Sequence, residues 1–222
     1  MSKKIITSIA FVLFTCSTFS ALADGHYHTE DVTFHNGDSV LAGTLTLPRG
    51  AGPYPAIVFI HGDGAMTRDS DGFLPLFWKE FTHHGFACLA YDKPGVGKSK
   101  GNWLTQSMHD RAVEALAAIE FLQARRDIQP DNIGFWGGSQ AGWVMPIAGS
   151  MSKDVSFIIS VSGAISWEKQ GYYMMTRRLQ REGCLEDEIR EALACAKEDN
   201  SFLRKASSFT EYKELIHVQD QN

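Results

Sequence analysis

Hydrophobic and polar residues alternate near the start of the chain and later give way to short runs that are apolar throughout. Residues 31–36 and 39–47 alternate in the manner of β-strands, and Asn36-Gly37 between them is typical of a tight turn, so we expect a hairpin. Apolar runs follow at 56–60, 86–91, 133–136 and 155–161. A run that is apolar on both faces predicts a strand buried in a parallel sheet.

Segments with helical spacing separate these apolar runs. Residues 74–84 place apolar side chains on one helix face and stop at Gly85. Residues 112–122 form an amphipathic helix within outer limits of 107–126, and a third helix follows Ser139. This order of elements predicts an α/β fold, a mostly parallel sheet with an N-terminal antiparallel hairpin and helices on both faces.

The character of the chain changes after residue 165. Residues 166–216 are rich in Glu, Arg, Lys, Ala and Leu at helical spacing and contain no β-branched run. We therefore expect several helices there and no further strand. The whole chain divides into a signal peptide at 1–23 and one domain at 24–222, with residues 165–216 as its helical C-terminal segment.

The first residues have the pattern of a secretory signal. Lys3 and Lys4 give a positive start, residues 5–15 form an apolar stretch, and Ala21-Leu22-Ala23 is the small-x-small pattern that signal peptidase recognises. This apolar stretch is too short for a stable membrane span, which needs about 20 residues. We expect cleavage after Ala23, a periplasmic or secreted protein, and no stable membrane span afterwards. The alternatives are an uncleaved anchor and a lipoprotein modified at Cys16.

Composition and charge exclude several classes of protein. Of the 222 residues, 44% are hydrophobic, 11% aromatic and 21% charged, which is typical of a soluble globular chain. These values exclude disordered, collagen-like and multi-span membrane proteins. The net charge is -5 without a basic cluster, so we expect no nucleic-acid partner.

The cysteines give no sign of chemistry. Cys88 lies in an apolar run, as a small buried hydrophobic residue does. Cys184 directly precedes, and Cys195 lies within, a helix predicted at 185–197, which would hold them about 16 Å apart and beyond disulfide reach. No metal-ligand spacing such as C-x-x-C occurs, so we expect neither a metal nor a cofactor.

The strongest chemical signal is Gly137-Gly138-Ser139-Gln140-Ala141-Gly142, between the predicted strand at 133–136 and a helix. A serine at so tight a turn has a strained backbone and an exposed hydroxyl, as a catalytic nucleophile needs. Strand and helix then approach closely, which requires small residues such as Gly137 and Ala141. The helix N-terminus also places N–H groups and a positive dipole beside a developing oxyanion. The alternative is a glycine-rich helix entry with a capping serine.

Three segments together resemble the α/β-hydrolase superfamily. They are Phe59-Ile60-His61-Gly62-Asp63-Gly64, Tyr91-Asp92-Lys93-Pro94-Gly95-Val96-Gly97-Lys98-Ser99 and the segment around Ser139. The resemblance covers residues 31 to about 165 and is greatest to serine esterases, thioesterases and prolyl-oligopeptidase-like hydrolases. It implies Ser139 as nucleophile, an oxyanion hole formed by the backbone N–H groups of Gln140 and Asp63, and a cap-like role for residues 165–216.

Two positions depart from the pattern of that superfamily. Ala141 stands where glycine is commonest, a tolerated change because alanine is nearly as small. Asp63 is an unusual oxyanion residue. Its carboxylate must point away, since it would otherwise repel the charge that its amide stabilises.

Other candidates have weaker support. Gly97-Lys98-Ser99 resembles the end of a phosphate-binding P-loop, but Asp92 stands where that motif needs glycine, so a structural turn is the better interpretation. His61 is either a base or, more simply, a brace for the loop that follows its strand. Trp136 and Trp143 lie on either side of the serine and either line an acyl pocket or pack in the core.

These features predict a secreted serine hydrolase that cleaves an ester, thioester or amide of a small-molecule acyl substrate through an acyl-enzyme on Ser139. The alternative is a non-catalytic remnant of the fold, which would lack a histidine and an acid after the serine. His217 is the only later histidine, and Glu168 is the best acid. Since no later buried strand carries such a pair, we expect a C-terminally truncated hydrolase with negligible turnover and an exposed apolar edge at 155–161. The rival is a minimal enzyme that uses His217.

Overall fold

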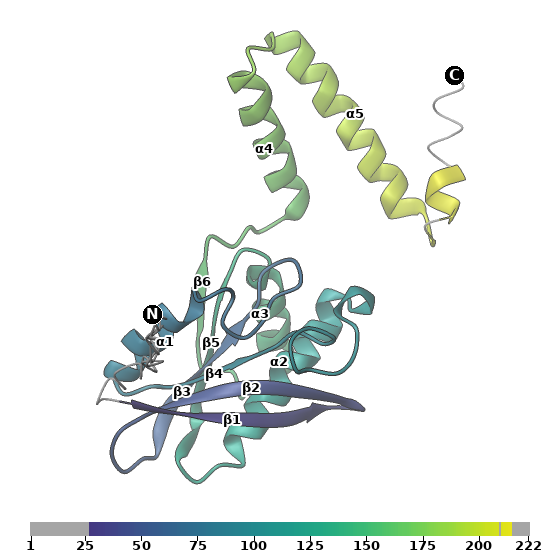
Figure 1. Ribbon diagram of the computed structural model, residues 1–222. Coiled ribbons are helices and arrows are strands. Elements are labelled where there is room, and N and C mark those ends of the chain that lie inside the picture. Colours follow the sequence, from purple (N-terminus) through teal and green to yellow (C-terminus); the bar gives the residue numbers. More distant parts are fainter. Residues whose placement is uncertain (1–26, 209, 215–222) are drawn as a thin grey trace, which may run out of the picture.

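The computed structural model describes residues 27–208 and 210–214, which form one mixed sheet, the helices packed on it and a helical C-terminal segment (Figure 1). The strands are β1 (Tyr27–Asn36), β2 (Ser39–Pro48), β3 (Tyr54–Ile60), β4 (Ala87–Tyr91), β5 (Ile128–Gly138) and β6 (Ile158–Val161). The helices are α1 (Leu74–His83), the 3-10 turn η1 (Trp103–Thr105), α2 (Met108–Gln123), α3 (Ala141–Met151), α4 (Trp167–Arg181) and α5 (Glu186–Lys205). The predicted signal peptide, Cys16 and His217 lie outside the described residues.

The sheet has the order β1-β2-β4-β3-β5-β6 and confirms the predicted α/β class. β1 pairs with β2, and β2 with β4, in antiparallel fashion, whereas β4, β3, β5 and β6 run parallel. Asn36 pairs with Ser39 across a two-residue turn in which Gly37 has a φ of 57°, a conformation that glycine adopts without strain. The predicted hairpin is therefore present, although its first strand begins earlier than residue 31.

Successive residues of the central strand β3 face two different cores, because side chains alternate along a strand. Val58 packs with the buried residues of α2 and α3. Ile57 and Phe59 pack on the other face, against Leu74 and Trp78 of α1. The predicted placement of helices on both faces is confirmed.

The helix α2 begins where its sequence supplies a cap. The Ser107 hydroxyl accepts a hydrogen bond from the Asp110 amide at 3.2 Å, and the Asp110 carboxylate accepts one from the Ser107 amide at 2.8 Å. This reciprocal pair satisfies two amides that a helix start leaves without partners. The helix ends at Gln123, inside the outer limit expected from the sequence.

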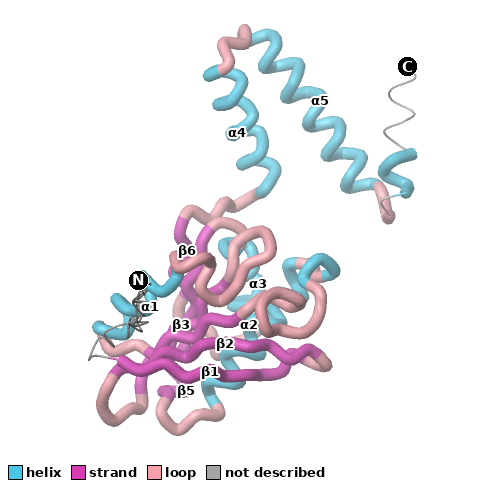
Figure 2. Tube along the Cα trace, viewed as in Figure 1, coloured by secondary structure: helices cyan, strands magenta, loops and turns pink. Residues whose placement is uncertain are grey.

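One predicted strand differs from its expected environment. The run 155–161 was expected to form a buried strand, but β6 covers only Ile158–Val161 and its apolar side chains are 36–44% exposed. The prediction of burial was wrong because, among the described strands, β6 pairs with β5 alone and lies at the sheet edge (Figure 2). An exposed apolar edge of the kind expected from the sequence is therefore present.

The helices predicted for residues 166–216 are confirmed over the described part of that segment. α4 and α5 pack on each other and stand away from the sheet (Figure 1). Cys184 and Cys195 are free, as is the buried Cys88. No helix in residues 27–208 and 210–214 is long and apolar enough to cross a membrane.

The packing predicts how the core responds to truncation of a leucine. Leu122 of α2 is 0% exposed, whereas Leu104 is 73% exposed. Leu122→Ala removes buried methyl groups and leaves a cavity, so we expect a loss of about 2–5 kcal/mol in the free energy of unfolding. Leu104→Ala should change it by no more than about 0.5 kcal/mol. Urea denaturation of both variants makes the measurement, and equal losses would contradict the packing described.

Candidate active site

Ser139 occupies a sharp turn between β5 and α3. Its φ is 54°, a left-handed conformation that is strained for any residue except glycine. The backbone is held on both sides, because the Ser139 amide donates to the Val161 carbonyl at 3.0 Å and the Gly142 amide donates to the Ser139 carbonyl at 2.9 Å. The side chain is exposed. The strained conformation expected for this serine is present, and its role as a nucleophile stays a prediction.

The residues around this turn have no room for larger side chains. A Cβ added to Gly137 would lie 2.5 Å from the Cβ of Ala141 and 2.9 Å from the Ile60 carbonyl oxygen. A Cβ added to Gly142 would lie 2.7 Å from the Cα of Gly163. These approaches explain the small residues that the sequence shows at positions 137 and 141, and they show that alanine fits the second position.

A cavity of about 520 Å³ opens beside Ser139, at the carboxyl ends of β3, β5 and β6. This is the edge where open α/β sheets bind ligands. Most of its lining is apolar, and the rings of Phe77 and Trp136 lie 4.6 Å apart between centroids. The lining residues are Ile60, His61, Gly62, Asp63, Met66, Ser70, Phe73, Leu74, Phe77, Trp136, Gly138, Ser139, Val161 and Ser162. Trp143 is not among them, and its indole N–H donates to the Ala164 carbonyl.

The structure brings the two other predicted site residues, Asp63 and Gln140, together beside the serine. The end of β3 approaches Ser139 so closely that a Cβ on Gly62 would lie 3.8 Å from the Ser139 Cβ. The Asp63 carboxylate accepts a hydrogen bond from the Gln140 side-chain amide at 3.2 Å. Neither backbone N–H, of Asp63 or of Gln140, donates to an acceptor among the described residues.

His61 lies below this site as part of the core. It is 2% exposed, and its ring stands edge-on to that of Tyr91 with centroids 4.9 Å apart. Burial and the nearby charges of Lys93 and Arg111 lower the pKa of His61 to about 3. An imidazole with so low a pKa is a weak base at neutral pH. These properties favour a structural role for His61, in supporting the loop that follows β3, over a role as a general base.

Two buried cations, missed in the sequence, hold the loop that carries Asp63. The Lys93 ammonium donates to the Gly62 carbonyl at 2.8 Å and to the Gly64 carbonyl at 2.7 Å. The Arg111 guanidinium donates to the His61 carbonyl at 2.6 Å and also to the side-chain oxygen of Gln140. Lys93 is 1% and Arg111 is 6% exposed. Arg111 was missed because a lone arginine on an amphipathic helix usually predicts a solvated face. For Lys93, the one available signal was its position just after a strand, at the edge of the sheet where ligands bind.

A buried carboxylate partly balances these charges. Glu114, 2% exposed, accepts a hydrogen bond from the Gln106 side chain at 2.7 Å and another from Tyr91. Burial raises the pKa of Glu114 although these bonds and both cations oppose the rise. Burial, with the Arg111 charge, lowers the pKa of Lys93 to about 8. Among the described residues, no group of three or more His, Cys, Asp or Glu side chains is placed to hold a metal ion.

The comparisons with known proteins agree with this geometry. The sequence model of the X-Pro dipeptidyl-peptidase (S15) family matches residues 36–219, which is most of the chain. The chain belongs to this family. This match places the chain in the α/β-hydrolase superfamily, as the three sequence segments implied, and the fold agrees.

Individual proteins similar to this S15 family member match only part of the chain, at about one third sequence identity or less. Esterase FrsA of Escherichia coli O157:H7 is 32% identical over 93 residues, which are 40% of this chain and 22% of that one. Thiohydrolase aneE of Aspergillus aculeatus is 31% identical over 122 residues, 54% of this chain and 37% of that one. The Pyrococcus furiosus esterase Pf2001 superposes with a TM-score of 0.58 and 20% identity, covering 70% and 56% of the two chains. The S15 chain spans less than half the length of these two curated relatives.

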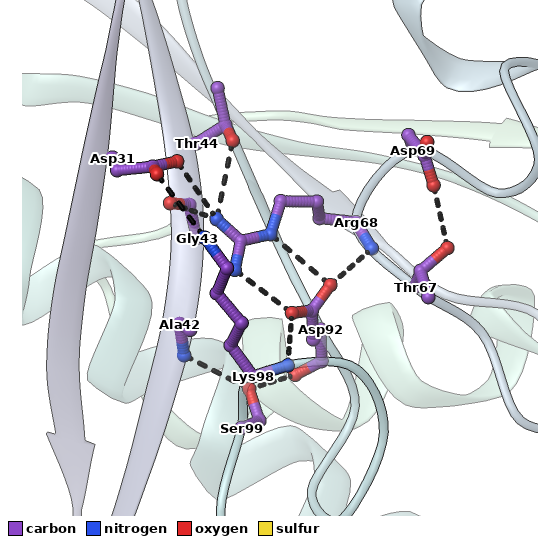
Figure 3. Close-up of polar contacts among 10 residues, drawn as sticks. All are labelled: Asp31, Ala42, Gly43, Thr44, Thr67, Arg68, Asp69, Asp92, Lys98 and Ser99. Carbon is purple, nitrogen blue, oxygen red and sulfur yellow. Dashed lines mark hydrogen bonds and ion pairs between the residues drawn. The ribbon is translucent and has the colours of Figure 1, made fainter.

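In this S15 chain, an ion pair at Arg68 also anchors the loop that carries Asp63 (Figure 3). The Arg68 guanidinium donates to both carboxylate oxygens of Asp92, at 3.2 and 2.9 Å, and to the Gly43 carbonyl at 2.6 Å. The Arg68 amide donates to Asp92 as well, at 2.8 Å. The side chains of Arg68 and Asp92 are 12% and 4% exposed. Loop and sheet are therefore joined by a largely buried, bidentate pair.

Asp92 also organises the turn that resembled a P-loop. Its carboxylate accepts from the Lys98 amide at 2.9 Å, and its carbonyl accepts from the Ser99 hydroxyl at 2.7 Å. A Cβ on Gly97 would lie 2.5 Å from the Asp92 carboxylate. The carboxylate thus occupies the centre of the turn, where the amides of a P-loop would surround a phosphate. The structural interpretation of Gly97-Lys98-Ser99 is confirmed.

The ion pair predicts acid sensitivity. Burial opposes ionisation of Asp92, but hydrogen bonds from Arg68 and Lys98 and the Arg68 charge outweigh it, so its pKa lies below its ordinary value. Its stabilising contribution is complete above the unfolded pKa of about 3.9 and is lost as pH falls through the lower folded pKa. We expect Asp92→Asn to cost about 3 kcal/mol at pH 7 and to flatten the acid limb of unfolding free energy against pH.

The matched control for that substitution is Asp69→Asn, because Asp69 is exposed and its carboxylate bonds only to the Thr67 hydroxyl. It should leave the free energy of unfolding within about 0.5 kcal/mol of the unaltered protein. The free energy of unfolding is measured by denaturation from pH 7 down to pH 3, a range that crosses the unfolded pKa of about 3.9. Parallel curves for Asp92→Asn and the unaltered protein would show that Asp92 does not carry the acid dependence.

Proposed function

We propose that this protein is a serine hydrolase that cleaves an ester, thioester or amide through an acyl-enzyme on Ser139. The observation that carries the proposal is the position of Ser139. Its strained turn lies at the mouth of a preformed cavity, at the start of α3, with two uncommitted backbone amides nearby. A nucleophile elbow has this geometry.

In the proposed reaction, the Ser139 oxygen attacks the carbonyl carbon of the substrate while a base takes the hydroxyl proton. The carbonyl oxygen becomes an oxyanion that accepts hydrogen bonds from the amides of Gln140 and Asp63, beside the positive end of α3. Collapse of this intermediate breaks the bond to the leaving group, which receives the proton. Water then releases the acyl group by the same steps.

The lining of the cavity favours an apolar acyl group. Phe73, Phe77 and Trp136 form one wall, and Asp63 is the only charged residue among those that line it. One oxygen of the Asp63 carboxylate accepts a hydrogen bond from the Gln140 side chain. The apolar wall favours an uncharged, apolar acyl group over a charged one.

A second candidate function is a non-catalytic remnant of the fold. The observation in its favour is that His61, with its pKa of about 3, is the only histidine among the residues that line the cavity. Without a base, the Ser139 hydroxyl is a poor nucleophile at neutral pH, and only residual catalysis by the oxyanion site is expected.

We also propose that the protein is exported, with its signal peptide cleaved after Ala23. The proposal rests on the positive start, apolar stretch and small-x-small pattern of residues 1–23. We expect the intact mass of the exported protein to match a chain that begins at Asp24. A mass that includes Met1, or a diacylglycerol on Cys16, would overturn this proposal.

The nucleophile is tested by labelling with an alkyl fluorophosphonate, which reacts with activated serines. We expect a single adduct on Ser139, seen by mass spectrometry of the digested protein, and slow hydrolysis of p-nitrophenyl butyrate. Ser139→Ala should abolish both. Ser162→Ala is the matched control, since Ser162 lines the same cavity and has the same φ of 54°.

Three results would contradict the proposed function. One is labelling that survives Ser139→Ala, a second is an unaltered protein that acquires no adduct and hydrolyses no ester above the buffer rate, and a third is a loss of labelling with Ser162→Ala. The second result would favour the non-catalytic remnant. A loss of labelling with Ser162→Ala, at an unchanged thermal midpoint, would move the nucleophile to the end of β6.

A further inference from the structure

The peptide unit between Gly62 and Asp63 links the buried cations to the cavity. In a trans peptide, the carbonyl of one residue and the N–H of the next point in opposite directions. The Gly62 carbonyl accepts hydrogen bonds from Lys93 at 2.8 Å and from Arg111 at 3.4 Å. A carbonyl held inward by these two cations directs the following N–H, that of Asp63, outward toward the cavity.

Arg111 connects the same loop to the residue after Ser139. Its guanidinium is a rigid, planar fork whose donors have fixed directions. One nitrogen donates to the carbonyl of His61 at 2.6 Å, and the other donates to the side-chain oxygen of Gln140. The fork therefore spans from the end of β3 to the start of α3, which are the two places that supply the proposed oxyanion amides.

We propose that Lys93 and Arg111 are positioning residues that set the direction and spacing of the two oxyanion amides, of Asp63 and Gln140. The inference rests on the proposed function of Ser139. Neither cation touches the substrate. Lys93 acts through the backbone carbonyls that it holds, and Arg111 acts through the His61 carbonyl and the side chain of Gln140. Both place positive charge behind the amides that face the developing negative charge.

The contacts of Arg111 also account for the unusual aspartate at position 63. Arg111 fixes the side-chain oxygen of Gln140, so the side-chain nitrogen of the same amide is turned toward the Asp63 carboxylate, at 3.2 Å. One oxygen of the carboxylate is thereby held against a side chain and not against the backbone N–H of Asp63. A carboxylate turned toward the oxyanion would cancel part of the stabilisation.

A merely structural role makes a different prediction. If the cations only balance Glu114 and fill the core, their removal lowers stability but leaves the reactivity of the folded protein unchanged. If they position the amides, the chemical step slows while affinity for an apolar inhibitor stays the same, because the cavity walls are elsewhere. The inactivation rate constant and the inhibitor dissociation constant of an alkyl fluorophosphonate separate these two effects.

The experiment compares the unaltered full chain with Arg111→Met and Lys93→Met. We expect the inactivation rate constant at Ser139 to fall about 10- to 100-fold in each, since loss of one oxyanion donor costs about 10²- to 10³-fold. The dissociation constant should change by less than about threefold, and guanidinium ion in the buffer should restore part of the rate of Arg111→Met. Arg125→Met is the matched control, because Arg125 is paired with Asp127 and Glu30 and contacts no residue of the cavity.

Gln140→Met keeps the test decisive if the buried substitutions prevent folding. It retains the backbone amide, lies at a partly exposed position, and removes both the contact to Arg111 and the tie on Asp63. We expect a fall in rate of about 10-fold, by the same argument of misplaced amides. Inactivation rate constants that are unchanged in every folded variant would overturn this inference alone. So would an inhibitor dissociation constant that rises by the same factor by which the rate constant falls. An unaltered protein that is not labelled overturns the proposed function and this inference with it.

Discussion

Gly137 is the point at which β3, β5 and α3 meet at van der Waals distance, and the geometry of the site depends on that contact. A side chain there would collide with Ala141 of α3 and with the backbone of Ile60 in β3. Because the helix starts so close to the strand, the chain has two residues in which to reverse, and Ser139 takes the positive φ that this reversal demands. The same contact brings the end of β3 opposite the serine.

The loop after β3 derives its rigidity from charge. Two cations are held out of water behind it, and the pKa of Lys93, about 8, reflects the cost of burying an ammonium group beside Arg111. Hydrogen bonds to backbone carbonyls offset part of that cost, and they give partners to carbonyls that the loop would otherwise leave unpaired. The result is a segment without regular secondary structure whose peptide planes are nevertheless defined.

The sequence was sufficient for the parts of the molecule that follow from local pattern. The hairpin, the alternation of strands and helices and the turn at Ser139 each depend on a few adjacent residues, and all of them were predictable. The side-chain pattern of β6 predicted burial, because an apolar run looks the same in a central strand and in an edge strand, and only the order of elements pointed to an exposed edge. Lys93 and Arg111 were missed for a related reason. Their partners are carbonyl groups, which leave no trace in the side-chain pattern.

Loop residues 61–73 are attached to the rest of the protein at several places, and part of the cavity wall lies beyond the last of them. Lys93 holds the carbonyls of Gly62 and Gly64, and Asp92 holds Arg68. The Lys93 amide also holds the Met66 carbonyl, at 3.2 Å, whereas Phe73, which faces the cavity, belongs to none of these attachments. The side chain of Phe73 therefore lies outside the contacts that hold the amides of Asp63 and Gln140. In directed evolution, substitutions at Phe73 change the shape of the binding wall without touching those contacts.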